Sequence, residues 1–72
     1  MEFAAHALDR VAERGVTRED VEYAWNRPMG ATGPGARRDT VKFQGRLPSG
    51  RGLVIVVSKY NRRRIITVWL AE

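Results

Sequence analysis

The spacing of apolar residues changes partway along this 72-residue chain, and the change limits the folds that the chain can adopt. Between residues 2 and 28 the apolar residues recur every three or four positions, which is typical of amphipathic helices. Between residues 39 and 71 they alternate with polar residues or form β-branched runs, which is typical of strands. A helical part followed by a strand part predicts one α+β domain over residues 1–72.

The helical part contains signals for two helices and for the junction between them. We expect the first helix over about residues 2–14, with Gly15 after it as a C-terminal cap. We expect the second helix over about residues 18–27. Thr17 would cap this helix, with Asp20 three residues later as an aspartate variant of the capping box.

The strand part predicts a small antiparallel sheet. A glycine-rich stretch over residues 29–38 indicates a flexible connection, and strands are expected over about residues 39–47, 52–59 and 64–71. The middle strand is apolar on both faces, as expected for a central strand covered by helices. The predicted fold is therefore two N-terminal helices packed on one face of a three-stranded antiparallel meander. In the third strand, one face is expected to carry Ile65, Thr67 and Trp69.

The net charge of +5 is unevenly distributed along the chain. Residues 1–22 hold six acidic residues and three arginines, whereas residues 23–72 hold ten Lys or Arg and only two acids. Eleven of the thirteen cations are arginine, which binds phosphate in a bidentate manner and stacks on bases. This pattern favours a polyanionic partner, above all nucleic acid, although a solvated arginine-rich surface would also have this composition.

Several classes of protein do not fit this composition. There is no cysteine and only one histidine, so we expect no disulfide, no metal site and no cofactor. The first twenty residues carry five acids, unlike a signal peptide, and no apolar run approaches the length needed to cross a membrane. We therefore expect a cytoplasmic protein that does not associate with membranes.

One stripe of the first helix has the residues needed for phosphate chemistry. His6, Arg10 and Arg14 follow one another at intervals of four, so they lie along one side of a helix. A histidine can exchange protons near neutral pH, and arginines one and two turns away can hold a phosphate. The structural alternative is that His6 packs or caps while the two arginines pair with Glu2, Asp9, Glu13 or Asp39.

A second cationic cluster lies at the predicted turn between the last two strands, and it includes an aromatic ring that can stack on a base. This cluster predicts contacts with single-stranded nucleic acid, although a basic turn also keeps a sheet corner soluble. Its members are Lys59, Tyr60, Arg62, Arg63 and Arg64. In the following strand, the hydroxyl of Thr67 can hydrogen-bond a phosphate if its face is open to solvent. For Trp69 a position in the core is the stronger expectation.

An ordered series of short motifs resembles an uncharacterised family of short bacterial domains. Members of this family begin with a His-Ala-x-x-Arg helix, followed by an Arg-Gly-[Ile/Val]-[Ser/Thr] junction. The final strand also resembles the Arg-Ile-Ile-Ser segment of BrnT toxins. The motifs in this chain are His6-Ala7, Arg10, Glu13-Arg14-Gly15-Val16-Thr17, Asp20-Val21, Pro28 and Arg64-Ile65-Ile66-Thr67-Val68.

Both groups are placed with RelE-like toxins and the barnase, EndoU and colicin nucleases. The resemblance implies a RelE-like fold and a metal-independent endoribonuclease, the toxin of a toxin–antitoxin or toxin–immunity pair. RNA would be cleaved through a 2′,3′-cyclic phosphate. By the same resemblance, His6 would be the general base or acid, Arg10 and Lys59 would stabilise the phosphorane, and Thr67 would orient the phosphate. Flanking phosphates would be held by Arg62 and Arg64.

The resemblance implies RNA and a cognate antitoxin or immunity protein as partners, and the sequence does not indicate an oligomeric state. The chief alternative is a non-catalytic module on the same scaffold that binds nucleic acid or protein. In that case His6 is structural, and the arginines make phosphate contacts that do not depend on sequence.

Overall fold

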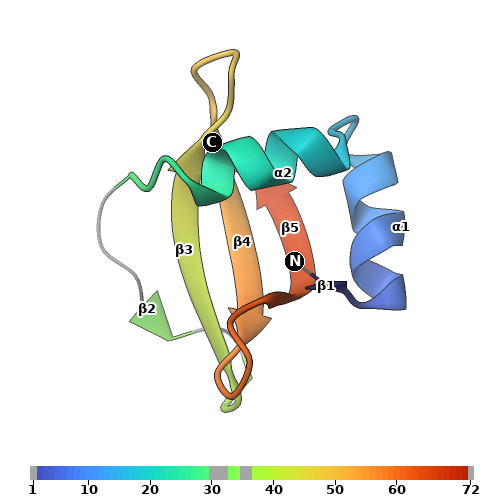
Figure 1. Ribbon diagram of the computed structural model, residues 1–72, viewed down its shortest axis with the longest axis vertical. Coiled ribbons are helices and arrows are strands. Elements are labelled where there is room, and N and C mark those ends of the chain that lie inside the picture. The colour runs from blue at the N-terminus through green and yellow to red at the C-terminus, as the bar shows by residue number, and fades with distance from the viewer. Residues whose placement is uncertain (1, 30–32, 35–36, 72) are drawn as a thin grey trace.

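One mixed sheet organises the fold in the computed structural model, which describes residues 2–29, 33–34 and 37–71 (Figure 1). Within these residues, five strands lie in the order β1-β5-β4-β3-β2. The long strands are β3 (Thr40–Arg46), β4 (Gly52–Ser58) and β5 (Arg64–Leu70), and the short ones are β1 (Glu2–Phe3) and β2 (Gly33–Pro34). The helices are α1 (Ala5–Glu13) and α2 (Arg18–Trp25).

The α+β class is right, but the predicted three-stranded antiparallel meander is wrong. Strands β3, β4 and β5 are antiparallel neighbours, whereas β1 pairs in parallel with β5 and β2 adds a further antiparallel strand beside β3. A two-residue strand is too short to show an alternating pattern, so neither edge strand has a signal in the sequence. Residues 2 and 3 were assigned to the first helix, but Ala4 has an extended backbone and α1 begins after it. Of the predicted flexible connection, residues 30–32 and 35–36 lie outside the described residues.

The junction between the helices has the predicted local structure. Gly15 follows α1 with a φ of 69°, and its amide donates to the carbonyl of Ala12 while the amide of Val16 donates to that of Val11. These two bonds form a Schellman motif, which only glycine enters without steric cost. The predicted capping box is confirmed, since Thr17 Oγ1 accepts from the Asp20 amide and the Asp20 carboxylate accepts from the Thr17 amide.

The two helices hold different positions against the sheet. Helix α2 crosses one face over β3 and β4, whereas α1 lies beside β5 at the edge of the sheet (Figure 1). Both helices contribute to one core on that face, as predicted, but α1 does so from the edge. One side of α1 contributes Ala7 and Val11 to the core, which leaves another side free to border the opposite face of the sheet.

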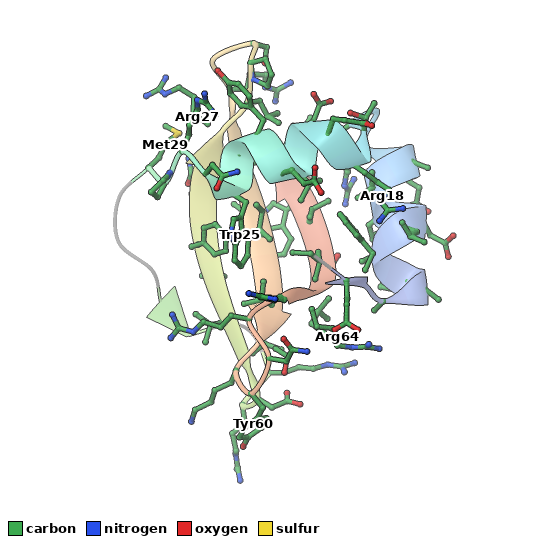
Figure 2. All side chains as sticks on the ribbon, viewed as in Figure 1. Arg18, Trp25, Arg27, Met29, Tyr60 and Arg64 are labelled. Carbon is green, nitrogen blue, oxygen red and sulfur yellow. The ribbon has the colours of Figure 1, made fainter. Side chains whose placement is uncertain are left out.

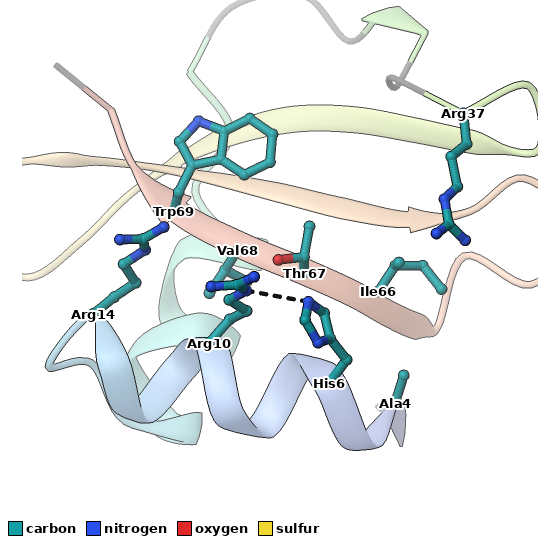
Figure 3. A pocket seen from close by; sticks show the side chains of 9 residues that line it. All are labelled: Ala4, His6, Arg10, Arg14, Arg37, Ile66, Thr67, Val68 and Trp69. Carbon is teal, nitrogen blue, oxygen red and sulfur yellow. Dashed lines mark hydrogen bonds between the residues drawn. The ribbon is translucent and has the colours of Figure 1, made fainter.

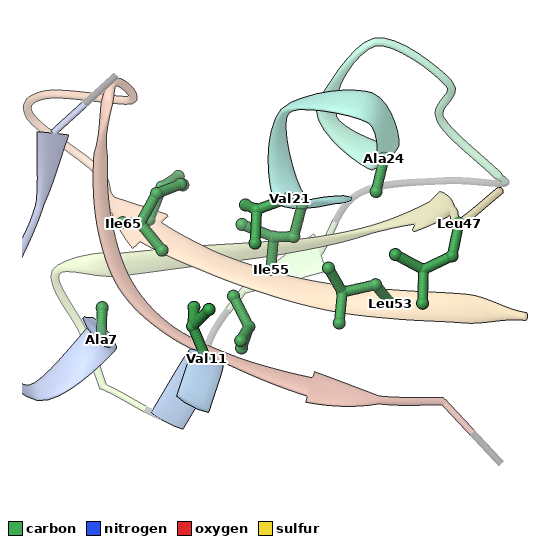
Figure 4. Close-up of a cluster of buried hydrophobic side chains, with 10 residues drawn as sticks. Ala7, Val11, Val21, Ala24, Leu47, Leu53, Ile55 and Ile65 are labelled. Atoms are coloured by element: carbon green, nitrogen blue, oxygen red, sulfur yellow. The ribbon is translucent and has the colours of Figure 1, made fainter. Parts of the chain in front are cut away.

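The core lies between the helices and the α2-facing side of the sheet (Figure 4). Strand β5 has a register shift opposite Val56 and Val57, typical of a β-bulge, so that Ile65 and Val68 are both fully buried. The prediction that Ile65, Thr67 and Trp69 share one face is therefore wrong for Ile65. The bulge turns Ile65 into the core and leaves Thr67 and Trp69 on the opposite face.

Candidate functional site

A groove runs between α1 and the face of the sheet that α2 does not cover. It encloses a cavity of about 580 Å³. Helix α1 supplies one wall and β5 the other, and the segment just before β3 closes one end (Figure 3). The polar and aromatic side chains that line it are His6, Arg10, Arg14, Arg37, Thr67 and Trp69.

The sequence prediction that His6, Arg10 and Arg14 lie along one side of the helix is confirmed. All three line the groove, and residues at intervals of four are about 6 Å apart along a helix axis. The predicted catalytic residue Thr67 faces them from β5 (Figure 3). Helix periodicity on one wall and strand alternation on the other thus bring four predicted site residues together.

Arg10 links His6 to Glu13 along this wall. Its Nε donates a hydrogen bond of 3.1 Å to His6 Nε2, and its Nη1 donates one of 2.9 Å to Glu13 Oε2. The contact with Glu13 is the kind of ion pair that the structural alternative predicts. In this bond Nε2 is the acceptor, which requires the tautomer with the proton on Nδ1.

The two other arginines of the groove make no ion pair with any acid in the described part of the chain. Figure 3 shows Arg14 at the end of the groove near Trp69, and Arg37 at the end near Ile66. The buried Thr40 holds the backbone at Arg37 in place, since its hydroxyl donates a hydrogen bond of 2.8 Å to the Arg37 carbonyl. Within the described residues, each end of the groove thus carries an arginine without an acidic partner.

Trp69 is a groove residue, so the expectation that it lies in the core is wrong. Its side chain remains 37% exposed. A second cavity of about 130 Å³ shares Trp69, Thr67 and Arg37 with the first and extends over Val56 and Thr40 toward β3. The open face of the sheet therefore continues the groove with a more apolar surface.

The described residues that line the main cavity include three arginines and one histidine but no carboxylate. Such a lining attracts anions, and arginine suits the oxygens of a phosphate. Among the described residues, no group of three or more His, Cys, Asp or Glu is placed to hold a metal ion.

The second predicted cluster lies on the turn between β4 and β5, and none of its members lines this groove. Tyr60 is 82% exposed and points away from the body of the protein (Figure 2). Arg63 borders a different cavity with Glu22 and Trp25 of α2. Lys59, predicted to act with His6, lies outside the groove and is exposed. The remaining members, Arg62 and Arg64, are also exposed on the surface of the protein.

Two of the polar and aromatic groove residues are missing from the site predicted from sequence. For Trp69 a signal existed, because strand alternation places it on the same face as Thr67. For Arg37 there was only its position at the end of a glycine-rich segment, and no periodicity connects that segment with α1.

One protein family matches residues 3–70, and its description is "Domain of unknown function (DUF4258)". No curated protein matches the chain, and no solved structure does so either. None of the described helices is long and apolar enough to cross a membrane.

Proposed function

The chain belongs to this family of unknown function, DUF4258, and we propose that it is a metal-independent endoribonuclease. The observation that carries the proposal is the groove in which His6 and Thr67 face each other between three arginines. The resemblance of the final strand to that of BrnT toxins, and of the helix motif to a family placed with RelE-like toxins, supports the same reaction.

In the proposed reaction, the ribose 2′-oxygen attacks the adjacent phosphorus and the bond from phosphorus to the 5′-oxygen breaks. His6 takes the 2′ proton as general base, and the leaving oxygen acquires a proton from His6 or from water. The products are a 2′,3′-cyclic phosphate and a 5′-hydroxyl. Because the attacking oxygen is part of the RNA, the proposed reaction needs neither an external nucleophile nor a metal to activate one.

The other groove residues have supporting roles. Arg10 moves from Glu13 to the phosphorane oxygens, where a guanidinium offsets the charge that develops. Thr67 donates its hydroxyl to the same phosphate. Because Lys59 lies outside the groove, the second stabilising cation in this proposal is Arg37 or Arg14.

A ribonuclease of this kind in the cytoplasm would require neutralisation, so we also propose a cognate antitoxin or immunity protein as partner. Expression of the wild-type protein without that partner is expected to arrest growth, whereas Arg10→Ala is expected to be tolerated. Equal toxicity, or equal harmlessness, of the two proteins at matched soluble levels would count against the roles assigned.

A second candidate function is RNA binding without cleavage. The hydrogen bond from Arg10 favours it, because this bond occupies the nitrogen that would accept the 2′ proton. Among the described residues that line it, the groove also offers only one group that commonly exchanges protons near pH 7.

The deciding experiment incubates total RNA in EDTA with wild type, His6→Ala or Tyr60→Ala, with and without ribosomes. The ribonuclease predicts cyclic-phosphate ends from wild type and Tyr60→Ala, and a loss of about 100-fold or more in His6→Ala. Intact RNA in all samples, together with salt-sensitive binding that His6→Ala retains, would instead establish the binding module.

A further inference from the structure

Apart from the imidazole of His6, Trp69 is the one aromatic side chain among the described residues that line the groove. It borders both cavities and therefore lies where they join. On β5 it lies two residues after Thr67 on the same face, about 7 Å farther along the strand. A group bound against Trp69 would thus lie next to a phosphate held at Thr67.

The ring of Trp69 has no stacking partner in the described part of the chain. The aromatic and cation–π contacts found there engage other rings. Trp25 packs edge-on against Phe43, and Arg18 and Arg27 lie over Phe3 and Tyr23. An indole that is 37% exposed at a groove and free of such contacts offers surface for a flat ligand.

The surroundings of the ring indicate which flat ligand fits. Arg14 lies at the same end of the groove and makes no ion pair with a described acid, whereas Val56 and Ile66 supply apolar surface beside the ring. A nucleotide combines a flat base with an anionic phosphate, and proteins bind single strands with this combination of aromatic surface and cations. A flat apolar compound without charge would make no electrostatic interaction with Arg14.

We propose that Trp69 stacks on one unpaired base next to the scissile phosphate, so that the groove selects single-stranded over double-stranded RNA. This inference rests on the proposed function in that RNA is the ligand of the groove. In a duplex both faces of a base are covered by its neighbours, so only a splayed base can stack on a side chain. A volume of about 580 Å³ is that of a pocket for one small ligand, which corresponds to one or two nucleotides.

The test uses Trp25→Phe, which leaves Trp69 as the only tryptophan. This protein is titrated with a fully 2′-O-methylated tetranucleotide, which lacks the attacking hydroxyl and cannot be cleaved. Stacking predicts quenching of Trp69 fluorescence by the single strand and none by a longer, fully paired 2′-O-methylated duplex that contains the same four nucleotides. The affinity, measured by anisotropy of a label on the oligonucleotide, should fall about 5- to 100-fold in Trp69→Ala. Trp69→Phe should retain most of it, and Tyr60→Ala, an exposed aromatic outside the groove, should bind as wild type.

The outcomes separate this inference from the proposed function. Binding without quenching, or equal affinity of wild type and Trp69→Ala, overturns the stacking. If stacking is observed while natural RNA stays intact, the ribonuclease proposal fails and the inference stands. If RNA is cleaved but Trp69→Ala binds and cleaves as wild type, the inference alone fails. If no oligonucleotide binds, both fail, and the groove becomes a candidate surface for a protein partner.

Discussion

Arg10 donates a hydrogen bond of 3.1 Å from its Nε to Nε2 of His6, one helical turn earlier. The same guanidinium reaches forward to Glu13, so a carboxylate, a guanidinium and an imidazole form a chain along one side of α1. A phosphate that enters the groove competes with Glu13 for Arg10. If Arg10 moves toward that phosphate, His6 Nε2 becomes available as a base.

Glu13→Gln tests this competition. The amide can still accept the hydrogen bond from Arg10 but has no charge, so the affinity for the non-cleavable tetranucleotide should rise about two- to fivefold at low salt. The ion pair is solvent-exposed, and its loss should lower the free energy of unfolding by only about 0.5 kcal/mol or less. Glu22→Gln on α2 makes the same charge change away from the groove. An equal gain in affinity from both variants would mean that net charge alone is responsible.

Thr40→Val tests whether the Thr40 hydroxyl helps to hold the Arg37 backbone in place. The substitution removes the bond from this hydroxyl to the Arg37 carbonyl at a buried position, while the Thr40 amide still donates to the same carbonyl, and the expected loss is about 1 kcal/mol in the free energy of unfolding. Affinity for the tetranucleotide should fall about two- to fivefold, because the cation at that end is less well positioned. Thr17→Val removes the N-cap of α2 at a similar cost but should leave RNA affinity unchanged. Equal binding by both variants would mean that the Thr40 hydroxyl does not position Arg37 for RNA binding.

Gly45→Ala should be the most destabilising of these changes. A Cβ at Gly45 would overlap the carbonyl oxygen of Ala24, because the end of α2 lies directly on β3. Relief requires a backbone shift, and the expected loss is about 1–3 kcal/mol in urea denaturation. Gly33→Ala is the matched control, since a Cβ there would meet nothing within 4 Å. Comparable midpoints of urea denaturation for Gly45→Ala and Gly33→Ala would contradict the close approach of α2 to β3.

The arginines of the β4–β5 turn should matter only for long substrates. Arg62 and Arg64 lie outside the groove, so Ala at either position should weaken binding of an RNA of twenty nucleotides or so and leave the tetranucleotide unaffected. A reduced affinity for the tetranucleotide would show that the turn contributes directly to the groove. Unchanged binding of both ligands would identify the turn as a solvated surface only.

The sequence predicted those parts of the fold that depend on local or periodic signals. Gly15, Thr17 and Asp20 mark the helix junction through bonds between residues at most five positions apart, and the long strands have alternating or β-branched patterns. The parallel pairing of β1 with β5 joins Phe3 to Ile65 across almost the entire chain, and a two-residue strand has no pattern of its own. The bulge after Ile65 was equally hidden, because Ile65 and Ile66 are both apolar and either could have faced the core.

The candidate site also has one part that the sequence predicted and another that it did not. Helical spacing was sufficient to align His6, Arg10 and Arg14, whereas their position opposite Thr67 depends on where α1 packs against the sheet. Lys59 was grouped with His6 through the family resemblance, and the structure places it outside the groove. Arg37 joins the groove through its contact with Thr40, a local bond that has no periodic signature.

The salt dependence of binding gives a further test of the cations in the groove. For single strands, the logarithm of the binding constant falls with the logarithm of salt concentration, with a slope of about −0.7 for each phosphate neutralised. Arg37→Ala should make the slope for the tetranucleotide shallower by about 0.7. Arg46→Ala removes the same charge from an exposed position on β3 outside the groove and should leave the slope unchanged. If both variants keep the wild-type slope, Arg37 does not contact phosphate. If both slopes become shallower by the same amount, the tetranucleotide responds only to the overall positive charge.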